Sequence, residues 1–208
     1  MPFIEKFPAS TSVVTAGWTN PTNAYTFNNS LTYTETNTAC QQYDGYSIPL
    51  TGNEVIDKVL VRLKTKTSLT TVAVGDTAVS YCNIQVYDGS TWTEYQIMAH
   101  DYTCTTANDE SFSISEGDNT NADILIDVTS IIDTLAKLQA FKTRLYFAVN
   151  PAAGVTIRWS IDCISVIVCY HVVGGVMATP PRNSAITKQS MNPRVKKALL
   201  NVKNALSH

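Results

Sequence analysis

Histidine is the side chain that most often transfers protons near neutral pH, and this chain has only three: His100, His171 and His208. No sequence motif joins any of them to a serine or cysteine nucleophile. The sequence also lacks a glycine-rich phosphate loop and a cysteine–histidine set at zinc-ligand spacing. We therefore predict no catalytic, cofactor-binding or metal-binding residues, and we expect a protein that is not an enzyme and needs no cofactor.

Carboxylates gather in one stretch between two expected strands. Oxygen ligands of this kind can bind Ca²⁺, but the stretch contains no EF-hand pattern. We interpret it as a solvated acidic loop. Its residues are Asp101, Asp109, Glu110, Glu116, Asp118 and Asp123.

The three tryptophans and ten tyrosines suggest a different chemistry, the stacking of sugar rings on aromatic side chains. Trp92 follows closely on the hairpin-turn signal Asp88–Gly89. It is the aromatic residue that we most expect to be exposed, and it is a candidate glycan contact. The composition favours an alternative, in which Trp18, Trp92 and Trp159 fill the core of a β-sandwich and its rims.

The formal charge of −2 hides a division along the chain. Residues 182–208 hold six Lys and Arg and no Asp or Glu, which leaves nine basic and 17 acidic residues in 1–181. This asymmetry indicates that the C-terminal segment has a partner of its own. The alternative interpretation is a solvated basic tail.

A basic amphipathic helix is predicted for residues 192–208, after a linker over 174–191. Asn192 suits the N-cap and Pro193 the first helical position. A helix of this length is marginal alone in water, so we expect it to dock on a partner. Docking on a protein ranks first, then a membrane surface, then nucleic acid. The docking stripe is Val195, Leu199, Val202 and Leu206, with Lys196, Lys197 and Lys203 steering towards an acidic surface.

Strands must position most of these side chains. Residues 54–65 alternate, which predicts a half-buried strand with Val55, Val59, Val61 and Leu63 on one side. Residues 129–141 between two strands predict a short helix capped by Thr129 or Ser130. Further strands are expected over residues 79–87, 93–100, 123–128, 144–149 and 155–173.

Short strands separated by turn signals predict an all-β protein, an antiparallel two-sheet sandwich with a jelly-roll-like arrangement over residues 1–173. Charged residues make up only 15% of the 208 residues, and threonine is abundant in the strands, as in an exposed structural protein. The N-terminus has no signal-peptide pattern, and no apolar run is long enough to span a membrane. Most of the five cysteines are expected to be small buried residues, with a Cys40–Cys104 disulfide as the alternative considered.

Five segments, in order, resemble β-sandwich domains of structural proteins from tailed phages and archaeal viruses. The first, GWTNPTNAYTFNNSLTYTE (17–35), carries a W-x-N-P-x-N-A opening, in which Asn20 and Asn23 can hold a turn around Pro21. The others are YSIPLTGNEVIDKVLVRLK (46–64), DGSTW (88–92), DVTSIIDTLAKLQAFKTRLYFAV (127–149) and IDCISVIVCY (161–170).

The resemblance implies a jelly-roll-like virion component: a capsid, decoration, spike, head-fibre or tail protein, made in the host cytoplasm without a signal peptide. We expect it to assemble with copies of itself and with other virion proteins, through the sandwich and the C-terminal helix. The alternative function is a carbohydrate-binding or host-adhesion module that uses Trp92. The cysteines and the basic C-terminal helix depart from the family pattern.

Overall fold

The computed structural model describes residues 2–70, 77–103, 111–112, 122–151 and 156–173. The chain divides into two units, Met1–Val173 and Gly174–His208, and every described residue belongs to the first. The linker and helix predicted for the C-terminal segment lie outside the described residues and stay predictions. No helix in the described part of the chain is long and apolar enough to cross a membrane.

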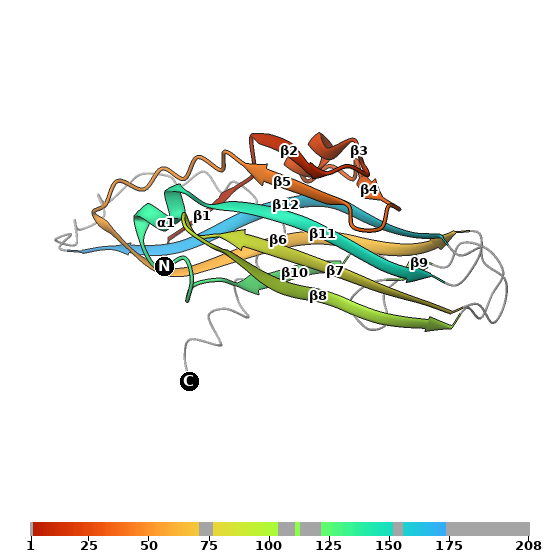
Figure 1. Ribbon diagram of the computed structural model, residues 1–208. Coiled ribbons are helices and arrows are strands. Elements are labelled where there is room, and N and C mark those ends of the chain that lie inside the picture. Colours follow the sequence, from red (N-terminus) through yellow and green to blue (C-terminus); the bar gives the residue numbers. More distant parts are fainter. Residues whose placement is uncertain (1, 71–76, 104–110, 113–121, 152–155, 174–208) are drawn as a thin grey trace, which may run out of the picture. The chain divides into compact units, whose positions relative to one another are not determined.

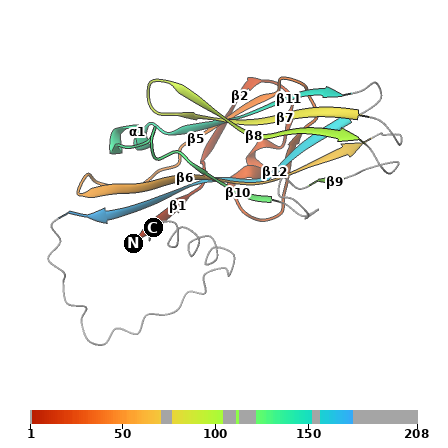
Figure 2. The same ribbon diagram turned by 90° about the horizontal axis from the view of Figure 1, so that it is seen from below.

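The strands form two antiparallel sheets that face each other (Figures 1 and 2). Sheet A contains β10 (Ala122–Asp127), β6 (Glu54–Thr70), β12 (Thr156–Val172), β4 (Thr32–Thr34) and β3 (Trp18–Thr19), with β1 (Phe3–Lys6) also on β12 and β9 (Ser111–Phe112) on β6. Sheet B contains β2 (Ser10–Thr15), β5 (Cys40–Asp44), β11 (Lys142–Pro151), β7 (Thr77–Tyr87) and β8 (Trp92–Thr103).

The order of the strands is that of a jelly roll. The chain passes from β4 in sheet A to β5 in sheet B, back to β6, and then through the β7–β8 hairpin of sheet B. It returns to β10 in sheet A, crosses to β11 and ends in β12. The neighbour orders β4-β12-β6-β10 and β5-β11-β7-β8 are those of the eight-stranded jelly roll. The predicted two-sheet sandwich is confirmed.

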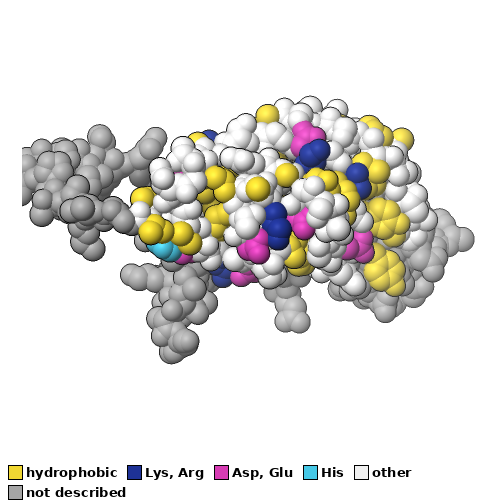
Figure 3. Space-filling model, turned by 60° about the vertical axis from the view of Figure 1, so that its left-hand side comes forward, with side chains coloured by type: hydrophobic (Ala, Val, Ile, Leu, Met, Phe, Trp, Pro, Cys, Tyr) yellow, Lys and Arg dark blue, Asp and Glu magenta, His cyan; other side chains and the backbone are white. Residues whose placement is uncertain are grey.

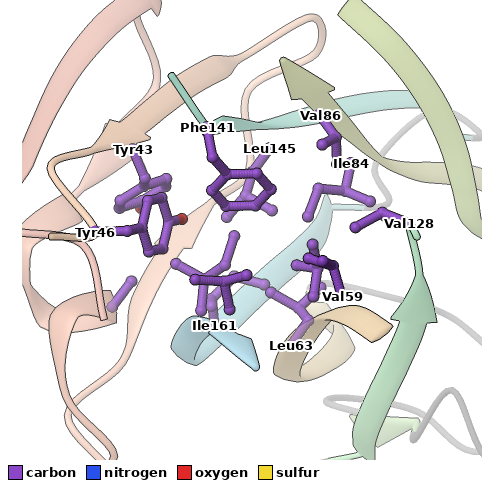
Figure 4. Close-up of a cluster of buried hydrophobic side chains, with 14 of the residues drawn as sticks. Tyr43, Tyr46, Val59, Leu63, Ile84, Val86, Val128, Phe141, Leu145 and Ile161 are labelled. Atoms are coloured by element: carbon purple, nitrogen blue, oxygen red, sulfur yellow. The ribbon is translucent and has the colours of Figure 1, made fainter. Parts of the chain in front are cut away.

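The core lies between the sheets, where apolar side chains from both layers interdigitate (Figure 4). Alternation along each strand directs every second residue inward, as the sequence pattern predicts. From sheet A come Val59, Val61 and Leu63, all fully buried. Tyr43 and Leu145 meet them from sheet B and are equally buried. Strands β1 to β5 and β9 were not predicted, because none is longer than six residues and such short segments give little alternation to recognise.

One residue of the predicted buried set lies on the wrong side. The register of β6 against β12 shifts between the pairs Cys169–Lys58 and Tyr170–Ile56, which leaves Asp57 unopposed. Such a β-bulge reverses which residues face the core. Ile56 therefore packs against the core, and Val55 is 41% exposed. The prediction that Val55 shares a face with Val59 was wrong for this reason.

The internal helix is shorter than predicted and begins later. Helix α1 spans Leu135–Gln139, and its N-cap is Thr134, whose hydroxyl accepts from the Lys137 amide. Thr129 instead joins two strands, because its hydroxyl accepts from the Val59 amide at 3.0 Å. The hydroxyl of Thr129 also donates to Asp127 at 2.5 Å, so Thr129 serves the sheet rather than the helix.

The W-x-N-P-x-N segment forms a 3₁₀ turn, η1 (Pro21–Tyr25), after strand β3. Asn20 adopts a left-handed backbone with φ of 50°, and Asn23 donates from its amide to the Leu31 carbonyl at 2.9 Å. Trp18 packs edge-on against Trp159 with ring centroids 5.4 Å apart. The Asn23 side chain thus helps to hold the turn, as expected, whereas the Asn20 side chain makes no capping hydrogen bond.

The four described cysteines, Cys40, Cys82, Cys163 and Cys169, are buried free thiols. Cys40 is thus a free thiol, and Cys104, its partner in the disulfide considered, lies outside the described residues. Burial raises the pKa of the Cys163 thiol to about 12, which keeps it protonated and unreactive at neutral pH. These four cysteines behave as the small apolar residues that the sequence analysis predicted.

Candidate functional site

The outward face of sheet B carries a continuous band of polar side chains. One residue from each of the five strands lies in register across the sheet, from β2 through β5, β11 and β7 to β8. The five are Ser12, Gln42, Arg144, Gln85 and Glu94. Since neighbouring strands are about 4.8 Å apart, the band spans roughly 19 Å of surface.

Hydrogen bonds fix the side chains of this band. Arg144 donates from Nε to Oε1 of Gln42 at 3.1 Å. Both carboxylate oxygens of Glu94 accept from amides, one from Gln85 at 2.8 Å and one from Asn83 at 2.9 Å. The amides and the carboxylate are therefore held in set orientations before any ligand arrives.

Two aromatic rings lie beside the band, because Tyr87 and Trp92 are cross-strand partners on β7 and β8. Their ring centroids are 5.0 Å apart with the planes tilted by 35°. The Arg144 guanidinium carbon lies 3.8 Å from the centroid of the Trp92 ring, and the Lys142 ammonium lies 5.8 Å from that of Tyr87. Each ring therefore has a cation beside it.

The hairpin turn before Trp92 is tightly made. Oδ1 of Asp88 accepts from the backbone amides of Ser90 and Thr91, both at 2.8 Å. These backbone hydrogen bonds, of which the one from Thr91 has the largest effect, lower the pKa of Asp88 to about 2. The Tyr87 hydroxyl donates to the Gly89 carbonyl at 2.9 Å. The predicted D-G turn is confirmed, and it sets where Trp92 enters the sheet.

We call this group the Trp92 face. It offers aromatic surface, amide donors and acceptors, and two cations, and it presents no nucleophile beside a general base. Such groups can bind a ligand by stacking and hydrogen bonding. The group consists of Gln42, Asn83, Gln85, Tyr87, Trp92, Glu94, Lys142 and Arg144.

The structure places one of the predicted site residues and leaves the others open. Trp92 lies on the outer face of sheet B but is half-buried, so it is less exposed than predicted, and its role as a glycan contact stays a prediction. The docking residues, Val195, Lys196, Lys197, Leu199, Val202, Lys203 and Leu206, lie outside the described residues. The sequence analysis missed Arg144 and Glu94. Their only signal was alternation within their strands, which does not reveal the neighbouring strand.

Among the residues that the structure describes, several other titratable groups lie in ion pairs. His171 pairs with Asp57 through Nδ1 and Oδ1 at 2.7 Å, with both residues at the end of the β6–β12 ribbon. Asp123, from the predicted acidic loop, forms a bidentate pair with Arg62 at 2.8 and 2.7 Å. No group of three or more metal-ligating side chains occurs among the residues with described positions.

A hollow of about 270 Å³ lies between the loop after β5 and helix α1. It is lined by Tyr46, Ile48, Leu138 and Phe141, together with Gly45, Ser47 and Gln139. None of these lining residues is charged. The hydroxyl of Tyr46 is already hydrogen-bonded to that of Thr143 at 2.7 Å.

The structure defines a jelly-roll β-sandwich with a polar and aromatic outer face. No family model matches this sequence, and a search of curated proteins gives no match either. Similar solved structures include the carbohydrate-binding module CBM32 of AlyQ in complex with 4,5-unsaturated mannuronic acid. It has a TM-score of 0.31 and 8% identity, over 78% of this chain and 97% of that one.

Two further similar structures are another carbohydrate-binding module and a virus. The family 32 module of NanJ from C. perfringens, in complex with galactose, has a TM-score of 0.29 and 10% identity, over 79% of this chain and 99% of that one. The structure of the infectious bursal disease virus Gt strain has a TM-score of 0.31 and 14% identity, over 84% of this chain and 34% of that one. Scores and identities this low carry no inference about function.

Proposed function

We propose that the protein is a virion structural protein, displayed on or built into a particle, that assembles with copies of itself and other virion proteins. The ordered resemblance of residues 17–170 to viral β-sandwich domains supports this, and jelly rolls are a common architecture of capsid proteins. Assembly would use the sandwich and the basic C-terminal segment.

The observation that carries the proposal is the apolar end of the β6–β12 ribbon. Val55, Val172 and Val173 are 41%, 54% and 66% exposed; Val55 lies on β6, Val172 ends β12, and Val173 follows it as the last described residue. The Val173 amide donates to the Asn53 carbonyl at 3.3 Å, which keeps this end in the sheet. Exposed apolar groups at the point where the predicted linker begins are suited to burial in an assembly.

Deletion of residues 182–208 is expected to leave the sandwich folded and to abolish incorporation into particles. The stripe Val195, Leu199, Val202 and Leu206 would be lost while the core between the sheets remains intact. Incorporation is measured by the amount of protein that sediments with purified particles, and folding by circular dichroism and cooperative unfolding.

Two variants distinguish the role of the apolar stripe from the role of the lysines. Changing the four stripe residues to Ser is expected to have the same effect as deletion. Changing Lys196, Lys197 and Lys203 to Gln is expected to slow assembly and reduce its salt dependence, because these charges steer rather than hold. Normal incorporation of the truncated chain would show that the proposal is wrong.

The second candidate function is adhesion to a glycan, and the Trp92 face favours it. Sugars present both C–H surfaces and hydroxyl groups, which match aromatic rings and fixed amides. A particle protein can hold both roles, since a displayed domain can assemble at one end and adhere at another face.

Trp92→Ala is expected to remove specific signals that the wild-type protein gives on a glycan array, because the main stacking surface is lost. The matched control is Tyr33→Ala. Tyr33 is an outward aromatic residue of sheet A with the Arg158 guanidinium carbon 4.5 Å from its ring centroid. Array signals that survive in Trp92→Ala, or that disappear equally in Tyr33→Ala, would contradict adhesion through this face.

A further inference from the structure

Arg144 lies near the centre of the Trp92 face and is held there on two sides. Its Nε donates to Gln42 on β5 at 3.1 Å, and its guanidinium lies against the Trp92 ring of β8, with 3.8 Å between the guanidinium carbon and the ring centroid. The side chain therefore crosses β7 to reach the ring. A guanidinium fixed in this way loses little further freedom when it binds a ligand.

Arg144 differs from the other described arginines in its lack of a carboxylate. Arg62 pairs with both Asp123 and Glu5, and Arg158 pairs with Glu35. Among the described residues, nothing hydrogen-bonds to the terminal nitrogens Nη1 and Nη2 of Arg144, and no acid forms an ion pair with it. Figure 3 shows one face of the molecule, on which most of the basic side chains lie directly beside acidic ones. An arginine without such a partner departs from that pattern.

The acid in the same band of residues, Glu94, forms no ion pair with Arg144. Glu94 is separated from it by Gln85, and both oxygens of Glu94 accept amide hydrogen bonds. Lys142, the other cation of the face, likewise has no ion pair with a described residue. Neither cation of the face therefore forms an ion pair with a described residue.

We propose that the Trp92 face binds an acidic saccharide, with the carboxylate of a uronic or sialic acid on the terminal nitrogens of Arg144. A planar guanidinium matches a carboxylate with two parallel hydrogen bonds. Tyr87 and the part of Trp92 that Arg144 leaves uncovered contact the C–H surface of the sugar. The amides of Gln42 and Gln85 lie on the outer face, where hydroxyl groups can reach them. This inference rests on the adhesion function proposed above and names its ligand class.

The composition of the face favours a saccharide over a nucleic acid. Polyphosphates bind through many cations, with an affinity that falls steeply with salt. Here only Lys142 and Arg144 are cationic, and Glu94 and Asp44 lie on the same outward face. Uncharged amides form most of the remaining polar surface, and these suit hydroxyl groups. A single carboxylate with neighbouring hydroxyls is the anion that fits this arrangement.

The experiment compares the full chain with pairs of ligands that differ only in charge, by calorimetric titration. The ligands are oligogalacturonate and its methyl ester, and sialyllactose and lactose. The wild-type protein is expected to bind at least one acidic member about tenfold or more tightly than its neutral counterpart. Arg144→Gln is expected to remove that difference, and Arg144→Lys to retain part of it, because a lysine keeps the charge but not the fork.

Arg158→Gln is the matched control, because it removes an arginine that lies on an aromatic ring of the other sheet. It should leave binding unchanged, and unfolding curves show whether each variant is folded. Equal binding of acid and ester that depends on Trp92 but not on Arg144 would overturn the acidic ligand and leave adhesion standing. Absence of binding to every saccharide would overturn both. Binding that is equal for sulfated and carboxylated polymers and unaffected by Arg144→Gln would also overturn the inference.

Discussion

Replacement of Lys64 by Met is expected to lower the free energy of unfolding by about 3–5 kcal/mol, because it leaves a buried carboxylate without a counter-charge. The side chain of Asp162 is fully buried, and its Oδ2 lies 2.9 Å from Nζ of Lys64. Asp162 has no other polar partner among the described residues. Nζ also donates to Asn29 at 3.2 Å and lies 3.9 Å from the centroid of the Phe27 ring, which limits access for water.

Denaturant unfolding of the purified variants measures this effect, and Lys58→Met is the matched control. Lys58 lies on the same strand and also faces outward, but its partner Asp127 is 53% exposed and their ion pair is 3.2 Å long. Such a pair contributes less than about 1 kcal/mol. The double variant Lys64→Met, Asp162→Leu is expected to recover most of the loss, since it removes the unpaired charge. Equal effects of Lys64→Met and Lys58→Met would contradict the prediction.

Trp159→Ala is expected to cost about 3–5 kcal/mol of unfolding free energy, as for large aromatic residues in other protein cores. Trp159 is fully buried on β12, between Trp18 on sheet A and Phe147 on sheet B. Its indole nitrogen donates to the Thr65 hydroxyl, so truncation removes a buried hydrogen bond as well as packing. The loss is larger than packing alone because a cavity remains at the site.

The same substitution at the other two tryptophans gives unfolding free energies with which the Trp159→Ala value can be compared. Trp18→Ala is expected to have an intermediate effect, since Trp18 packs edge-on at the rim of the core. Trp92→Ala is expected to cost no more than about 1–2 kcal/mol, because the half-buried ring of Trp92 lies on the outer face beside Arg144. Unfolding free energies that fail to rank Trp159 first would contradict the assigned position of the core.

The two proposed functions would use different parts of the sandwich. Assembly would use the exposed end of the β6–β12 ribbon on sheet A and the segment that follows it. Adhesion would use the outward face of sheet B. Variants of Trp92 and Arg144 should therefore leave incorporation into particles unchanged, while deletion of residues 182–208 should leave saccharide binding unchanged.

Much of the fold could be predicted from local patterns, and the limits of that prediction are visible at single residues. Period-two alternation gives Cys82, Ile84 and Val86 their inward positions, which all three hold. The same pattern failed at Val55, because a bulge at Asp57 shifts the pairing by one residue. Nothing local marks that bulge, since it depends on the partner strand β12.

The candidate site, too, could be predicted only in part from local patterns. The D-G turn of residues 88–89 predicted that Trp92 would be exposed near a hairpin; Trp92 does follow the turn, but its ring is half-buried. That Arg144 would lie on the ring could not be predicted, because β11 and β8 are separated in the sequence and by a third strand in the sheet. The buried pair of Lys64 and Asp162 was likewise hidden, since a bulge turns Asp162 outward beside Lys64.

The sequence by itself determined the class of fold, the turn before Trp92, the apolar character of the described cysteines and the separation of charge between body and tail. Each of these depends on residue types and short spacings, which act through local backbone preference and burial. Only the tertiary structure decided which side chains share a face and which cation lacks an acid. In a jelly roll the neighbours of a strand come from distant parts of the chain, and a single bulge reverses its faces.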